Sequence, residues 1–130
     1  MKISIFGLGY VGSVSAACFA SLGHEVFGID TKKEKNECVN SGKAPIFESG
    51  LDVLIKKAID KQRLLATEDV DFAVKNSEVS IICVGTPSLS DGNIDLSYVR
   101  KVCEEISKSL KSKDEYHVIV VRSTIPPGTI

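Results

Sequence analysis

Three glycines and one aspartate form the pattern with the clearest chemistry in this sequence. Gly7, Gly9 and Gly12 make a G-x-G-x-x-G turn after an apolar segment, and Asp30 ends the next apolar segment. Gly7 would permit a sharp turn, Gly9 would let a diphosphate approach the backbone, and Gly12 would let a helix pack closely. The N–H groups at the start of that helix would then bind the diphosphate. A glycine-rich turn without a ligand is the alternative, and the acidic partner argues against it.

Asp30 also indicates which dinucleotide would bind. Its carboxylate would accept hydrogen bonds from the adenosine ribose hydroxyls and would repel a 2′-phosphate, so that NAD is favoured over NADP. Lys32, Lys33 and Lys35 follow closely, and a lysine could attract that phosphate. We interpret Lys32 and Lys33 as part of a solvated helix face. FAD and S-adenosylmethionine also bind glycine-rich first loops, and Asp30 alone does not exclude them.

Two later loops carry hydroxyl residues beside proline or glycine. Thr86 lies in the loop 83–87 and Thr124 in the loop 122–129, each after an apolar segment. In a doubly wound sheet the ligand lies outside the carboxyl ends of the strands, where the strand order reverses. Thr86 and Thr124 would then contact the cofactor near its nicotinamide end, or they would simply stabilise turns. Their spacing does not decide between these roles.

Strand and helix patterns alternate along the chain. β-Branched and apolar runs predict strands at 2–6, 25–29, 64–66, 79–84 and 118–121, and helical periodicity predicts helices at 10–22, 32–39, 51–61, 69–75 and 96–110. This alternation predicts one domain over residues 1–130. We expect an α/β fold, a doubly wound (Rossmann-type) parallel sheet with helices on both faces and strand order 3-2-1-4-5.

Several finer features are predicted within these elements. The runs 79–84 and 118–121 are almost wholly apolar and should be buried on both faces. In the first helix, apolar residues recur at helical spacing, and a second stripe holds only small residues that would allow close packing on the sheet. These stripes are Val11, Val14, Cys18 and Leu22, and Gly12, Ala16 and Ala20. Gly23 should end this helix. Thr67 or Asp69 should cap the helix at 69–75, and Asp95 the one at 96–110.

Composition narrows the classes of protein that fit. The chain has 130 residues, of which 43% are hydrophobic and 25% charged, enough for a packed core. Its net charge of -1 offers no basic surface for nucleic acid and no polybasic face for a membrane. No apolar run has the length of a membrane span, and no signal-peptide pattern precedes the first strand. We therefore expect a cytoplasmic protein.

The four cysteines do not form a recognisable metal or disulfide pattern. Cys18, Cys38, Cys83 and Cys103 are too far apart in sequence for a metal-binding pair. Disulfides are rare in the cytoplasm. We interpret the cysteines as small apolar residues within helices and strands, and no metal site is predicted.

Several ordered motifs together are more specific than the glycine turn. They are residues 5–12, 23–26 with Asp30 and Lys35, 45–48, 84–87, Asp91-Gly92 with Asp95, and Ser123-Thr124 with 127–129. In these motifs the chain resembles, over its whole length, the N-terminal NAD-binding domain of the UDP-glucose/GDP-mannose dehydrogenase family. Cys18 and the stretches 42–46 and 120–124 are most similar to the members that oxidise GDP-mannose, with UDP-glucose as the next candidate. Ser49 departs from the family pattern, which usually has proline there.

The resemblance implies a role for each matching position. Tyr10 and Val11 would lie along the pyrophosphate, Asp30 and Lys35 at the adenosine ribose. Thr86 and Thr124 would lie on the nicotinamide side. Glu48 lies in a family loop, but its role is not implied.

The resemblance also implies the reaction of the complete enzyme. Family members oxidise the C6 alcohol of a nucleotide sugar to a carboxylate with two NAD, through a cysteine thioester. None of the four cysteines here matches that nucleophile, so no catalytic residue is expected in these residues. The sugar nucleotide would bind a further domain of a homo-oligomeric enzyme. Two alternatives stay open: a 6-phosphogluconate or hydroxyacid-type dehydrogenase domain, and a stand-alone non-catalytic NAD-binding module.

Overall fold

Five parallel strands form one sheet in the computed structural model, which describes residues 1–130. The strands are β1 (Lys2–Phe6), β2 (Glu25–Ile29), β3 (Leu64–Thr67), β4 (Val79–Ile82) and β5 (Val118–Val121). Their order is β3-β2-β1-β4-β5, which confirms the predicted doubly wound topology. The strand order reverses between β1 and β4, so a ligand crevice is expected at the carboxyl ends of these two neighbours.

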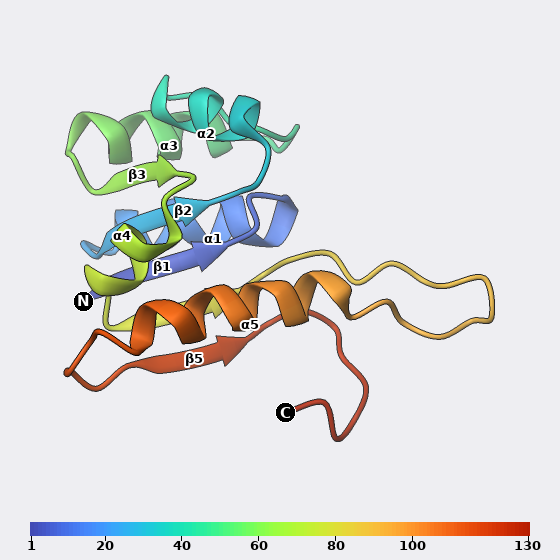
Figure 1. Ribbon diagram of the computed structural model, residues 1–130. Helices are drawn as coiled ribbons and strands as arrows, with labels where there is room; N and C mark the ends of the chain where they lie inside the picture. Colours follow the sequence, from blue (N-terminus) through green and yellow to red (C-terminus); the bar gives the residue numbers. More distant parts are fainter.

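Five helices cover the two faces of the sheet. They are α1 (Tyr10–Ser21), α2 (Lys33–Asn40), α3 (Leu51–Asp60), α4 (Val70–Lys75) and α5 (Ser97–Leu110). Figure 1 shows α4 and α5 in front of the sheet and α1 behind it. Each face has its own apolar core: one joins α1 and α3 to the sheet around Ile5 and Ile55, and the other joins α4 and α5 around Phe6 and Ile106.

The first helix packs on the sheet through its small residues. Gly12, Ala16 and Ala20 are all buried, as predicted. A Cβ atom added at Gly12 would lie only 1.7 Å from the carbonyl oxygen of Gly7, which leaves no room for a side chain. The alternative apolar stripe does not face the sheet: Val11 and Leu22 are 46% and 74% exposed. Because α1 packs so closely on the sheet, only small side chains fit on the face that it buries.

The last strand contradicts the prediction of a buried strand. Val118, Ile119 and Val120 in β5 are 37%, 44% and 40% exposed. β5 pairs with β4 alone and forms an edge of the sheet, at the bottom of Figure 1. An apolar run shows that a strand can be buried, but it does not show which neighbours the strand has.

Local hydrogen bonds form at the N-termini of α4 and α5. The Asp69 carboxylate accepts from the Phe72 N–H at 2.9 Å and caps α4, while the Thr67 hydroxyl accepts from the Asp69 N–H at 3.0 Å. Asp95 lies one residue further out than predicted, because Leu96 occupies the N-cap of α5. Its carboxylate accepts from the Ser97 N–H at 2.8 Å, and hydrogen bonds from Ser97 lower the pKa of Asp95.

Candidate dinucleotide-binding site

The glycine turn joins β1 to α1 and leaves its outer side open. Gly7 has φ +95°, and a Cβ atom there would lie 2.8 Å from the carbonyl oxygen of Cys83 on the next loop. A Cβ atom at Gly9 would meet no atom within 4 Å, so the backbone is accessible at this position. No side chain caps the start of α1. The first N–H groups of the helix are therefore available to an anion such as a diphosphate.

Asp30 connects the end of β2 to this turn. One carboxylate oxygen accepts from the Leu8 N–H at 2.8 Å and lies 3.4 Å from the Lys35 ammonium, and the other accepts from the Lys32 N–H at 2.9 Å. The Asp30 side chain is only 10% exposed. Since a carboxylate has about four acceptor positions, these contacts leave capacity for a ligand hydroxyl.

A cleft of about 700 Å³ opens beside Asp30. Gly7, Gly9, Asp30 and Lys35 all line it, so the structure brings together these four predicted residues. The remaining lining residues are Phe6, Ile29, Thr31, Lys32, Glu68, Val70, Cys83, Val84, Gly85, Tyr98, Lys101, Val102 and Glu105. The volume lies within the range typical of small-molecule sites.

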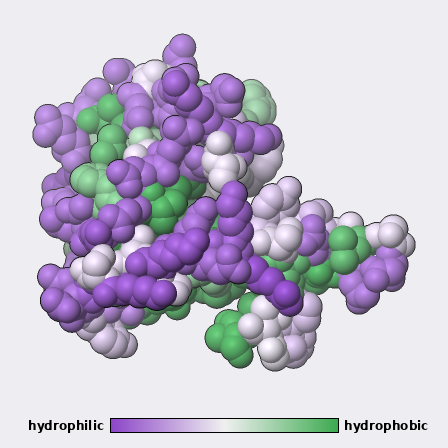
Figure 2. All heavy atoms as spheres, in the orientation of Figure 1, coloured by the Kyte–Doolittle hydropathy of each residue, from purple (hydrophilic) through white to green (hydrophobic).

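Sequence reasoning missed the contribution of α5 to this cleft. Tyr98, Lys101, Val102 and Glu105 recur at helical spacing and border the cleft along one side of the helix. Their spacing was a usable signal, because it places them beside the apolar stripe of the same helix. The outer face of α5 is strongly hydrophilic, as Figure 2 shows, and carries Arg100, Glu104 and Lys108.

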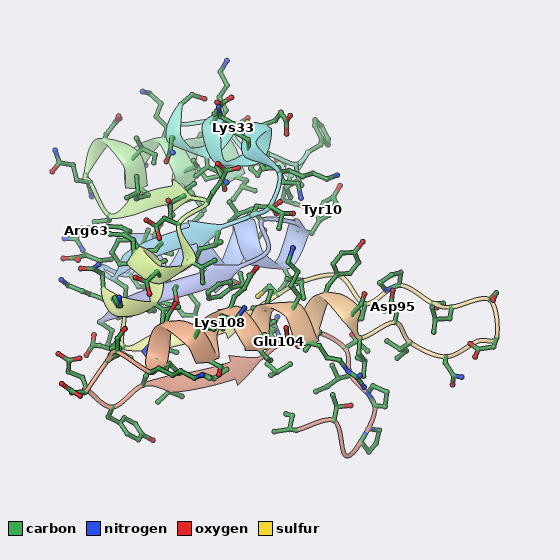
Figure 3. All side chains as sticks on the ribbon, in the orientation of Figure 1. Tyr10, Lys33, Arg63, Asp95, Glu104 and Lys108 are labelled. Atoms are coloured by element: carbon green, nitrogen blue, oxygen red, sulfur yellow. The ribbon has the colours of Figure 1, made fainter.

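Tyr10 and Val11 face a second cleft, of about 510 Å³. It is lined by residues of α1, α3 and the loops before α3 and after β5: Tyr10, Val11, Val14, Ser15, Glu48, Ser49, Leu51, Leu54 and Arg122. Figure 3 shows Tyr10 at the start of α1, on the side of the molecule to which the strands point. The glycine turn thus contributes to both clefts: Gly9 lines the larger one, and Tyr10, the next residue, lines the smaller one.

The two threonine-containing loops lie against each other. The Ser123 hydroxyl donates to the Val84 carbonyl at 2.7 Å, and the Ser123 N–H donates to the Ile82 carbonyl at 3.1 Å. These bonds hold the loop after β5 against the loop after β4. Thr86 is half-buried and Thr124 is exposed, and neither lines the two clefts described above. Their contact with a cofactor stays a prediction.

The three lysines near Asp30 have different surroundings. Lys33 is 70% exposed and pairs with Glu37 at 3.6 Å on the outer face of α2, as expected for a solvated position. Lys32 was interpreted in the same way, but it lines the larger cleft. Lys35 lines that cleft too and contacts Asp30 directly.

The cysteines are all free, and three of them, Cys18, Cys38 and Cys103, lie within helices as predicted. Cys18 in α1 is exposed, and Cys83 lies just beyond β4 instead of within a strand. Burial raises the pKa of the Cys83 thiol, and the positive charge of Arg122 opposes this shift only in part. A raised pKa keeps the thiol protonated near neutral pH, which is the reverse of what a nucleophilic cysteine needs.

The structure contains neither a cluster of metal ligands nor a membrane-spanning helix. No three side chains of the His, Cys, Asp and Glu types are grouped so that they could hold a metal ion. No helix combines the length and the apolar character needed to cross a membrane.

The topology, the open glycine turn and the buried carboxylate define a dinucleotide-binding α/β domain. The family model described as the NAD binding domain of the UDP-glucose/GDP-mannose dehydrogenase family matches residues 1–130. This chain belongs to that family. The predicted resemblance and the predicted cofactor, NAD, are thereby confirmed, and the alternative of a 6-phosphogluconate or hydroxyacid-type domain is not supported.

Individual relatives agree with this assignment. GDP-mannose 6-dehydrogenase from Pseudomonas aeruginosa is 50% identical over 100% of this chain and 30% of its own length. The crystal structure of a ternary complex of GDP-mannose dehydrogenase from the same species has a TM-score of 0.98 over 99% of this chain and 30% of that one. UDP-glucose 6-dehydrogenase from Rhizobium meliloti is 45% identical over 99% of this chain and 29% of its own length. The chain thus spans about 30% of the relatives that it matches.

Proposed function

We propose that this chain supplies the NAD-binding domain of a nucleotide-sugar 6-dehydrogenase, with GDP-mannose as the favoured substrate and UDP-glucose as the next candidate. The observation that carries the proposal is the direct contact between the glycine turn and the Asp30 carboxylate. Gly9 leaves the turn open, and Asp30 accepts a hydrogen bond from the Leu8 N–H inside that same turn. The backbone that would bind a diphosphate and the carboxylate that would bind an adenosine ribose therefore lie next to each other.

Each predicted residue takes one part of the cofactor in this proposal. Gly7, Gly9 and Gly12 shape the turn, and the backbone at Tyr10 and Val11 binds the diphosphate. Asp30 accepts from the adenosine ribose hydroxyls, and Lys35, 3.4 Å away, donates to the same ribose. Thr86 and Thr124 contact the nicotinamide half from the loops after β4 and β5. The bound NAD supplies hydride transfer, while these residues bind and orient it.

The complete enzyme would oxidise the C6 alcohol of the sugar to a carboxylate with two NAD. Its nucleophilic cysteine and its sugar-nucleotide site would lie outside the residues described here, because none of the four cysteines matches the nucleophile. We further propose a cytoplasmic homo-oligomer that acts in polysaccharide biosynthesis. The support comes from GDP-mannose 6-dehydrogenases, which are up to 50% identical to this chain among the relatives compared.

Calorimetric titration of the chain with NAD and with NADP tests the proposal. We expect NAD to bind at least about tenfold more tightly, because a 2′-phosphate would place its charge against the Asp30 carboxylate. FAD and S-adenosylmethionine serve as controls and should not bind. Equal dissociation constants for NAD and NADP would contradict the role of Asp30, and absence of NAD binding would contradict the proposed function.

A further inference from the structure

Asn36 in α2 has a buried side-chain amide of which only one end is hydrogen-bonded within the protein. The residue is 4% exposed. Its Nδ2 donates to the Asp30 carbonyl at 2.8 Å, while no protein group donates to its Oδ1. A buried acceptor without a donor destabilises the folded state, because the oxygen has lost its hydrogen bonds to water. Stability of the fold therefore does not account for an asparagine at this position.

The hydrogen bond from Asn36 reaches the residue that carries the candidate ribose-binding carboxylate. Asp30 directly follows β2. Its carboxylate is held by the N–H groups of Leu8 and Lys32, at 2.8 and 2.9 Å. Its backbone carbonyl accepts a hydrogen bond from Asn36 alone. The glycine turn and the turn before α2 thus fix the Asp30 side chain, and α2 itself fixes the Asp30 backbone.

The backbone at the start of α2 is only weakly closed. Lys32 occupies the N-cap without a side-chain hydrogen bond, and the Asn36 N–H lies 3.5 Å from the Lys32 carbonyl, which is long for a hydrogen bond. One turn further on, Asn40 binds the N–H and the carbonyl of Ala66 in β3, both at 2.8 Å. Two asparagine side chains therefore attach α2 to the sheet, Asn36 at the end of β2 and Asn40 at β3.

We propose that Asn36 is a positioning residue for the dinucleotide: by holding the Asp30 backbone, it keeps the Asp30 carboxylate directed at the adenosine ribose. This inference rests on the proposed function and adds to it a residue that lines neither cleft. Asn36 does not touch the ligand and acts only through Asp30. Its unpaired Oδ1 is a local defect of the kind expected where binding, and not stability, selects a residue.

Asn36→Leu and Asn40→Leu form a matched pair of variants, because each replaces an asparagine of α2 by an apolar residue of similar shape. Asn36→Leu removes the unpaired oxygen together with the bond to Asp30, so the midpoint of urea unfolding should stay the same or rise. Its Kd for NAD, measured by calorimetry, should increase about threefold to tenfold, the range of one hydrogen bond.

Asn40→Leu is the control and should show the reverse pattern. It leaves the N–H and the carbonyl of Ala66 without their side-chain partners, so the midpoint of urea unfolding should fall. Asn40 makes no contact with Asp30 and lines neither cleft, so the Kd for NAD should stay the same.

A double-mutant cycle shows whether Asn36 acts through Asp30. In a chain with Asp30→Ala the ribose contact is already lost, while the glycine turn still binds the diphosphate. Adding Asn36→Leu to this chain should therefore change the Kd for NAD by less than about twofold. An effect of Asn36→Leu as large in this background as in the unmodified chain would overturn the inference, because Asn36 would then act independently of the carboxylate.

Two further results would overturn the inference. One is an unchanged Kd for NAD in Asn36→Leu. The other is an unfolding midpoint lowered as far as in Asn40→Leu, which would mean that Asn36 serves the fold. In both cases the unmodified chain binds NAD, so the proposed function survives. If the unmodified chain does not bind NAD, the proposed function fails together with the inference, and this first titration distinguishes the two failures.

Discussion

At the scale of single residues, the three glycines of the turn have different physical reasons to be glycine. Gly7 has a positive φ, Gly12 has no space for a Cβ atom, and Gly9 has space but faces the predicted diphosphate. These roles could be predicted, because the spacing of the motif fixes them locally. The presence of Arg122 and Tyr10 in one cleft could not be predicted, because it depends on which loops come together at the carboxyl ends of the strands.

Gly9→Ala should separate ligand binding from folding. The alanine Cβ would meet no protein atom within 4 Å, and φ -82° is allowed for alanine, so the only expected cost is that of alanine at the N-cap of α1, about 1 kcal/mol. Its Cβ would occupy the approach to the backbone, and we expect NAD affinity to fall at least about tenfold. Calorimetry and chemical unfolding measure the two effects. Unchanged affinity for NAD would show that the diphosphate does not approach the turn at Gly9.

Gly12→Ala, in contrast, should mainly lower the stability of the fold. Its Cβ would lie 1.7 Å from the Gly7 carbonyl oxygen, so α1 must move away from the turn. Overpacking of this kind costs about 1–3 kcal/mol of unfolding free energy. Urea unfolding monitored by circular dichroism measures the loss. A variant as stable as the unmodified chain would contradict the close packing of α1.

At the scale of helices and strands, the sequence predicted the type and order of the elements correctly. It predicted which of their faces are buried less accurately. All five strands and five helices were predicted near their observed bounds. The order of the strands was predictable because parallel crossovers leave few topologies. The small-residue face by which α1 packs on the sheet was predicted as well. The exposure of β5 was not, since it depends on neighbours that periodicity does not reveal.

The capping of α4 gives a test at this scale. Asp69→Ala removes the acceptor for the Phe72 N–H and should cost about 1 kcal/mol of unfolding free energy. Asp69→Asn keeps an oxygen acceptor and should retain most of the stability. Urea unfolding of both variants checks the prediction. Equal losses for alanine and asparagine would contradict the capping role.

A polar network links β5 to the neighbouring elements. His117 lies 2.8 Å from the Ser80 hydroxyl and 3.1 Å from the Lys113 ammonium. Burial lowers the pKa of His117 below its ordinary value of 6.5, and the charge of Lys113 lowers it further. Lys113 also donates to the carbonyls of Val74 and Ser77, so its ammonium is held beside the ring.

This lowered pKa predicts a loss of stability in mild acid. Below pH 6.5 the unfolded chain binds a proton at His117 that the folded chain resists, so unfolding becomes easier as the pH falls toward the folded pKa. Above that range the residue is neutral in both states and has no effect. The free energy of unfolding can be measured above and below the ordinary pKa of histidine. Between these two conditions, His117→Gln should lose less of it than the unmodified chain does. Equal losses would contradict it.

At the scale of the whole molecule, the proposed function predicts that the chain binds the cofactor but carries no catalytic nucleophile. It spans about 30% of its dehydrogenase relatives, and the thiol of Cys83 is protonated near neutral pH. We expect the purified chain to bind NAD but to form no NADH from GDP-mannose or UDP-glucose, as followed by NADH absorbance. Sugar-dependent NADH formation would show that the chain carries its own catalytic residues.

A crystal structure of this chain grown with NAD would test the central claim most directly. We expect density for the diphosphate against the backbone of Gly9 to Val11, and for the adenosine ribose within hydrogen-bonding distance of the Asp30 carboxylate. A crevice without density for the dinucleotide at saturating NAD, or an Asp30 side chain turned away from the ribose, would contradict the account.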